Sequence, residues 1–131
     1  MAKKKAQIEL YSYGEYSNWD RGSKSLPKVV NISEIVEVTL GTEFGYVLRM
    51  KQAKGMLINF RIIHPPCNDE HGNPIGDLTG ELYVNSNDYE FFLGDCVWAP
   101  LHDKLGKWRL ITELDGKVVA DKTLTLVERM N

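Results

Sequence analysis

The chain has 131 residues, of which 43% are hydrophobic and 26% charged, and its formal net charge is −2 at pH 7. This length suits one domain with a single core, and the composition is that of a globular chain rather than a disordered one. The charge balance provides no basic field for nucleic acid, and no apolar run approaches the ~18 residues that span a bilayer.

The N-terminal residues 1–5 contain three lysines, but no apolar segment follows that would complete a signal peptide. We therefore expect a cytoplasmic protein, a single domain over residues 1–131, and a frayed tail over residues 1–5. In a reducing compartment, Cys67 and Cys96 are expected to be thiols.

Short alternating apolar runs recur along the chain, and no window of 11 or more residues keeps a helical period. In the first run, residues 7–13, Ile8 and Leu10 are predicted on one face and Tyr11 and Tyr13 on the other. Residues 17–28 are expected to form a loop, and the longest irregular segment is expected over 64–77. The further strands are expected over 32–40, 44–50, 58–62, 78–84, 89–93, 108–112 and 118–124.

The last two strands are separated by a turn signal at positions 115–116. A two-residue turn there would set apolar residues opposite charged ones. A three-residue loop over 114–116 instead sets Arg109 opposite Asp121, which is favourable by ~0.2–1 kcal/mol. The sequence therefore predicts the three-residue loop.

Seven or eight short strands without crossover helices predict an all-β, antiparallel, immunoglobulin-like β-sandwich. True immunoglobulin domains have a core Trp between two bridged cysteines. No suitably placed Trp lies between Cys67 and Cys96, so the term describes the architecture only.

Five short segments carry a resemblance to a known family: Tyr13-Gly14-Glu15-Tyr16, Gly41-Thr42-Glu43-Phe44-Gly45-Tyr46, His64-Pro65-Pro66, Gly106-Lys107-Trp108 and Asp115-Gly116-Lys117. With these landmarks the chain resembles the bacterial domain-of-unknown-function family 3859 over almost its whole length. The resemblance implies a compact β-sandwich without an established biochemical role, and it implies no catalytic residues.

The segment His-Pro-Pro-Cys-Asn-Asp-Glu-His at 64–71 is the densest group of chemically reactive side chains. Its imidazole and thiol groups make His64, Cys67 and His71 candidate metal ligands. No second paired motif completes a zinc site, so a solvated loop after a strand is the alternative. Nucleophile and phosphate-loop motifs are missing too, and we expect neither an enzyme nor a cofactor.

Four aromatic residues near the N-terminus, Tyr11, Tyr13, Tyr16 and Trp19, are candidate ligand-binding residues. Exposed rings could stack on sugars or anchor a protein, whereas packing within the domain would hide them. The sequence favours a non-enzymatic protein-interaction module that binds a partner or itself through a sheet edge. A carbohydrate-binding module and a metal-binding domain are the alternatives, and neither nucleic acid nor membrane is expected as a partner.

Overall fold

The computed structural model describes residues 5–18 and 25–130, which form almost entirely β-structure. The strands are β1 (Gln7–Tyr16), β2 (Val29–Ile32), β3 (Ile35–Val38), β4 (Glu43–Lys51), β5 (Leu57–Ile63), β6 (Cys67–Asn68), β7 (Pro74–Ile75), β8 (Leu78–Tyr83), β9 (Asp88–Cys96), β10 (Gly106–Leu114) and β11 (Lys117–Glu128), and one short 3-10 helix, η1 (His102–Lys104), precedes β10. The predicted β-sandwich is confirmed. Eight of these strands match the predicted runs, and the short strands β2, β6 and β7 are additional.

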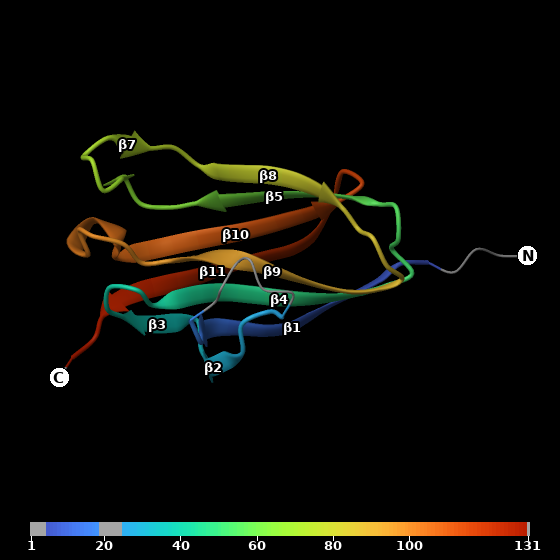
Figure 1. Ribbon diagram of the computed structural model, residues 1–131, viewed down its shortest axis with the longest axis horizontal. Coiled ribbons are helices and arrows are strands. Elements are labelled where there is room, and N and C mark those ends of the chain that lie inside the picture. The colour runs from blue at the N-terminus through green and yellow to red at the C-terminus, as the bar shows by residue number, and fades with distance from the viewer. Residues whose placement is uncertain (1–4, 19–24, 131) are drawn as a thin grey trace, which may run out of the picture.

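Two sheets pack against each other (Figure 1). The first sheet has the order β2-β1-β4-β9, and the second has the order β3-β11-β10-β5-β8. Strands β2 and β3 are joined by only two residues, so the edges that they form lie on the same side of the sandwich. Strands β9 and β8 form the edges on the opposite side.

The core lies between the two sheets and is built from alternating residues of the central strands. The inward residues of β4 are those predicted, Phe44, Tyr46, Leu48 and Met50, and all are fully buried. The indole of Trp108 packs edge-on against Phe44, with ring centroids 5.0 Å apart. This interdigitation of apolar side chains from both sheets is what holds the sandwich together.

One polar contact crosses this core between the sheets. The hydroxyl of Tyr46 on β4 lies 2.5 Å from the hydroxyl of Thr112 on β10, and both residues are fully buried. Burial raises the pKa of Tyr46 well above its ordinary value, and the hydrogen bond to Thr112 opposes that shift only in part. Each hydroxyl therefore depends on the other for its hydrogen bond within the described part of the core.

A row of glycines crosses the first sheet. Gly14, Gly45 and Gly94 lie directly opposite one another on β1, β4 and β9. Gly45 has φ +153°, and a Cβ built on it would lie 2.2 Å from the carbonyl oxygen of Leu93. The strands approach so closely here that a side chain at position 45 would displace the backbone of β9.

The turn between β10 and β11 differs from the prediction. Asp115 and Gly116 have φ +48° and +83°, and Leu114 pairs directly with Lys117. These features define a two-residue type I′ turn, so the predicted three-residue loop is wrong. Asp115 is held in this conformation by β5, because its backbone and carboxylate exchange hydrogen bonds of 2.9 and 2.8 Å with the backbone of Leu57.

A bulge at Val119, just after that turn, resets the register of the hairpin. Thr112 lies opposite Ala120, and Arg109 lies opposite Thr123 rather than Asp121. The Arg109–Asp121 ion pair forms nevertheless, at 2.6 Å, as a diagonal contact. Diagonal neighbours on one face remain within reach of long side chains.

No helix in residues 5–18 and 25–130 has the length and apolar character needed to cross a membrane.

Candidate functional site

The aromatic residues predicted as a binding strip lie in different environments. A bulge at Tyr11 interrupts β1, because Leu10 pairs with Leu48 while Ser12 already pairs with Val47. The inserted residue reverses the alternation, so Tyr13 packs against the core whereas Tyr11 lies on the outer face. The prediction that the two share a face is therefore wrong, and its physical cause is the bulge. Trp19 lies outside the described residues.

Each described tyrosine of this set already has a contact. Tyr11 is 47% exposed, but the guanidinium of Arg49 lies 3.4 Å from its ring centroid. Tyr13 has the ammonium of Lys122 at 4.1 Å from its ring. Tyr16 is only 3% exposed, and burial raises its pKa to about 12. The three rings do not form a continuous exposed platform for stacking.

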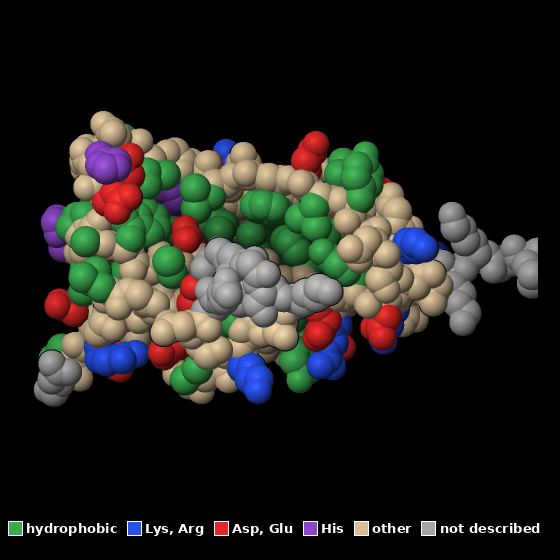
Figure 2. Space-filling model, viewed as in Figure 1, with side chains coloured by type: hydrophobic (Ala, Val, Ile, Leu, Met, Phe, Trp, Pro, Cys, Tyr) green, Lys and Arg blue, Asp and Glu red, His purple; other side chains and the backbone are tan. Residues whose placement is uncertain are grey.

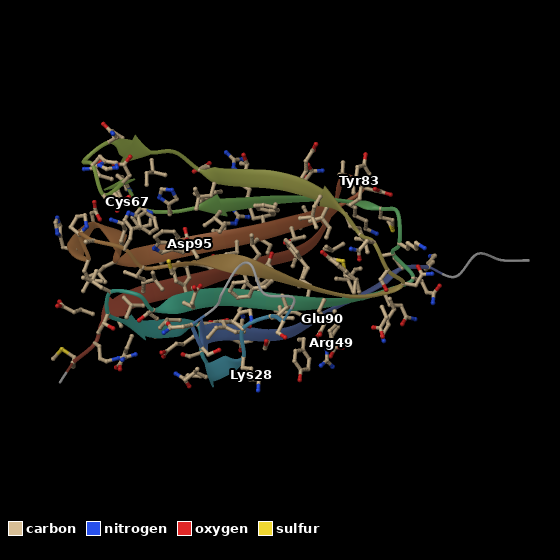
Figure 3. All side chains as sticks on the ribbon, viewed as in Figure 1. Lys28, Arg49, Cys67, Tyr83, Glu90 and Asp95 are labelled. Carbon is tan, nitrogen blue, oxygen red and sulfur yellow. The ribbon has the colours of Figure 1, made fainter. Side chains whose placement is uncertain are left out.

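An open groove of about 1200 Å³ lies on the outer face of the first sheet, between β1, β4, β9 and residues 25–29. Two charge pairs that cross from β4 to β9 line this groove, Arg49–Glu90 at 3.1 Å and Lys51–Asp88 at 2.8 Å. Arg49 and Glu90 are labelled in Figure 3. The hydrogen bond with Glu90 raises the pKa of Arg49 further above its ordinary value. Because the charges neutralise in pairs, the groove has no net field that would select an ion.

The predicted metal ligands are only partly brought together. The Sγ atom of Cys67 lies 3.4 Å from Nδ1 of His64, and the Nε2 atom of His64 lies 2.8 Å from the carbonyl oxygen of Gly76. His71 is exposed beyond them and lies 3.8 Å from Glu70. Across residues 5–18 and 25–130, no group of three or more His, Cys, Asp or Glu side chains could hold a metal ion. The predicted three-residue metal site is therefore not assembled in this structure.

The Cys67–His64 pair resembles a nucleophile and base in spacing but not in electrostatics. Cys67 is 5% exposed, and burial raises the pKa of its thiol. The ring of His64 stacks on Trp108, with centroids 5.0 Å apart. A thiol with a raised pKa is a poor nucleophile, so the geometry describes a packed end of the sandwich.

A buried cation anchors the same end of the molecule. Lys104 in η1 is fully buried, and its ammonium binds the carboxylate of Asp103 and the carbonyl oxygen of Pro100. The second carboxylate oxygen of Asp103 accepts the backbone N–H of Asn68, at 3.0 Å. The ion pair therefore links η1 to the β6–β7 hairpin, and its role is to hold these two elements together.

Several exposed apolar side chains of the described residues lie together on the edge formed by β2 and the start of β3. Val30, Ile32 and Ile35 are 61%, 57% and 59% exposed, and Val29 beside them is 38% exposed. Within the described part of the chain, β2 pairs only with β1, and Val30 bulges out of that pairing. Lys28 and Glu34 lie at the two ends of this segment and are exposed. We call Val29, Val30, Ile32 and Ile35 the apolar edge.

The apolar edge is a feature that sequence reasoning did not find. The run Val29-Val30-Asn31-Ile32 begins just after the loop expected over 17–28 and reaches only the first residue of the strand expected over 32–40, and its apolar residues do not alternate with polar ones. Three β-branched residues among four are nevertheless typical of a strand. That enrichment was the signal available for a strand, whereas a run without alternation is typical of burial on both faces, so the exposure of these residues could not be read from the sequence.

Comparison with known proteins identifies a family and a fold. A family model described as "Domain of unknown function (DUF3859)" matches residues 4–126. No curated protein matches the chain. The crystal structure of an immunoglobulin-like protein from Pseudomonas aeruginosa is similar with a TM-score of 0.74 and 17% identity, over 97% of this chain and 100% of that one. An alkylpurine DNA glycosylase from Pseudomonas fluorescens, solved bound to DNA containing an abasic site analog, has a TM-score of 0.45 and 7% identity over 95% of this chain and 31% of that one. The first similarity shows the immunoglobulin-like fold, and the second carries no argument.

Proposed function

The chain belongs to the family described as domain of unknown function (DUF3859), and we propose that this domain is a non-enzymatic protein-interaction module that binds its partner at the apolar edge. The observation that carries this proposal is the exposure of Val30, Ile32 and Ile35, each more than half exposed within six residues of chain. Contiguous exposed apolar side chains on a small domain mark interaction sites more often than isolated ones do.

The shape of the edge supports side-chain docking rather than strand addition. The bulge at Val30 interrupts the regular spacing of backbone groups on β2, and such a bulge is a common protection against edge-to-edge pairing. The aliphatic side chains remain available on both sides of the strand. The partner is therefore a protein with a complementary apolar surface, and Lys28 and Glu34 supply a polar rim.

The non-enzymatic part of the proposal is supported by how the reactive groups are used. The thiol of Cys67 is buried with a raised pKa. The carboxylate of Asp103 is engaged by Lys104 and by the backbone. These contacts stabilise one end of the sandwich.

The test compares two exposed aliphatic positions. Ile32→Lys changes the apolar edge, and Val118→Lys changes an isolated side chain at the β10–β11 hairpin that is similarly exposed, 52% against 57%. Proteins captured from lysate on immobilised wild type are identified, purified and titrated against both variants. We expect Ile32→Lys to weaken binding ~10-fold or more, because a partly buried aliphatic contact is lost and an ammonium must be desolvated. Val118→Lys is expected to bind as wild type does.

Equal affinity of Ile32→Lys and wild type for the purified partner would contradict the proposal, as would a wild type that captures nothing above the level of the bare support. Thermal melting of both variants shows whether either change has altered the fold.

A further inference from the structure

Strand β8 is the outermost strand of the second sheet and lies along the upper edge in Figure 1. Within the described residues its only strand partner is β5, and the six pairs between Leu78–Ile62 and Tyr83–Leu57 run without a register shift. Natural edges are usually blunted by Lys, Pro or a bulge. The sequence Leu-Thr-Gly-Glu-Leu-Tyr at 78–83 contains neither Lys nor Pro, so β8 presents a regular row of backbone donors and acceptors.

The two faces of β8 are clearly different. Leu78, Gly80 and Leu82 are half-buried on the inward face, whereas Thr79, Glu81 and Tyr83 are exposed. Figure 2 shows hydrophobic side chains gathered between β8 and β9 on the viewed face of the molecule. An added strand must therefore place its own apolar residues on the inward face.

We propose that β8 pairs antiparallel with β8 of a second copy of this chain, about a two-fold axis at Gly80. In this register Leu78 lies opposite Leu82 of the second copy, and Thr79 lies opposite Glu81 of the second copy. The two five-stranded sheets become one continuous ten-stranded sheet. This self-association is independent of the partner proposed for the apolar edge.

The charge pattern of β8 selects this register. Two-fold antiparallel pairing keeps inward residues opposite inward residues only when the axis passes through a residue. An axis at Glu81 would set the two Glu81 carboxylates opposite each other, and an axis at Thr79 would set Asp77 opposite Glu81. Directly opposed like charges destabilise a sheet. Of these three central registers, only the one at Gly80 sets no carboxylate opposite another.

Gly80 itself fits this arrangement. A Cβ built on Gly80 would lie 2.4 Å from Cζ of Phe60, so the Phe60 ring covers the glycine on the inward face. Opposed glycines at the axis leave the Phe60 rings of both copies beside the paired leucines. The predicted interface is one strand pair with apolar side chains on one side. The surface that it buries is therefore well below the ~800 Å² per partner of a standard interface. The dimer is therefore weak and depends on protein concentration.

The first experiment measures the dimer by sedimentation equilibrium over a wide concentration range. Thr79→Lys sets an ammonium opposite Glu81 of the second copy, and Thr79→Glu sets a carboxylate there. Each change acts twice across the axis, so we expect Thr79→Lys to strengthen and Thr79→Glu to weaken association, each by about 2-fold to 30-fold. Thr123→Lys and Thr123→Glu, at an exposed position on β11 where Thr123 lies opposite Arg109 and away from β8, are controls with no expected effect.

The second experiment tests the register. Thr79→Cys and Glu81→Cys variants are mixed under mild oxidation, and we expect a covalent heterodimer because the two positions face each other across the axis. Neither variant alone is expected to cross-link more than wild type, which reports the background from Cys67 and Cys96. A strict monomer at all concentrations, or preferential self-linking of Thr79→Cys or Glu81→Cys, would overturn the proposal. If Ile32→Lys binds the purified partner as tightly as wild type does, the proposed function is overturned, but the dimer proposal is not affected.

Discussion

The hydrogen bond between Tyr46 and Thr112 gives a direct test of how the two sheets are held in register. Both residues are fully buried, and their hydroxyl oxygens are 2.5 Å apart. Thr112→Val removes one hydroxyl with almost no change of volume and leaves the Tyr46 hydroxyl without its partner. Tyr46→Phe does the converse. A buried polar group left unsatisfied costs about 1–3 kcal/mol.

The double variant Tyr46→Phe/Thr112→Val separates the net free energy of the hydrogen bond from the cost of leaving one hydroxyl without a partner. Removing both hydroxyls leaves no orphaned group, so only the net value of the hydrogen bond is lost, about 0.5–1.5 kcal/mol. The two single variants together should lose about 2–6 kcal/mol. The coupling energy from the double-mutant cycle should therefore be about 1.5–4.5 kcal/mol. Tyr83→Phe, at a 68% exposed ring, should change stability by less than about 0.5 kcal/mol.

Urea unfolding followed by tryptophan fluorescence and far-UV circular dichroism measures these free energies. Trp108 is fully buried, so its emission reports the integrity of the core. Additive losses within about 0.5 kcal/mol would refute the reasoning, because additivity is the behaviour of sites that do not interact. A stable Thr112→Val variant would show that the Tyr46 hydroxyl finds another partner.

Two further predictions concern the first sheet and the buried ion pair. Gly45→Ala should destabilise the fold by about 3 kcal/mol or more, because its Cβ would lie 2.2 Å from the carbonyl oxygen of Leu93. Gly55→Ala, at φ +89° with no atom within 4 Å of the built Cβ, should lose only about 1–2 kcal/mol in the same urea assay, and equal losses would contradict the steric explanation. For Asp103, burial alone would raise the pKa, but the hydrogen bonds from Lys104 and the Asn68 N–H lower it below its ordinary value. A lowered folded-state pKa contributes stability above the unfolded value of about 3.9 and loses it as pH falls through the folded value. Asp103→Asn should therefore reduce the loss of stability on acidification below about pH 4 in urea titrations, and an unchanged pH profile would count against this assignment.

The sandwich was predictable because its central strands obey a period of two. The inward residues of β4 alternate without interruption, and all are fully buried. The errors occur where one inserted residue breaks that period. Tyr11 in β1 and Val30 in β2 lie at such bulges. The residues around them do not indicate that a bulge is present. Alternation alone cannot locate a bulge, because it is set by how neighbouring strands meet.

The hairpin turn failed for a different reason. Counting cross-strand charges favoured a three-residue loop, and the Arg109–Asp121 ion pair does form. The turn is fixed instead by β5, since Leu57 exchanges two hydrogen bonds with Asp115 and holds it at φ +48°. This contact joins residues 58 positions apart. A pairwise energy of ~0.2–1 kcal/mol between two strands could not outweigh it.

The two proposed contact regions lie on opposite sides of the sandwich. The apolar edge lies where β2 and β3 end the two sheets, and β8 ends the second sheet on the other side. Pairing through β8 would therefore leave one apolar edge at each far end of the dimer, both accessible. Such a dimer is bivalent, and two linked contacts raise the apparent affinity for a multivalent partner by about 10²–10⁴ when the geometry permits both. A weak dimer and a small docking surface would together give a strong interaction, and Thr79→Glu should then weaken binding to a multivalent partner while leaving binding to a monovalent one unchanged.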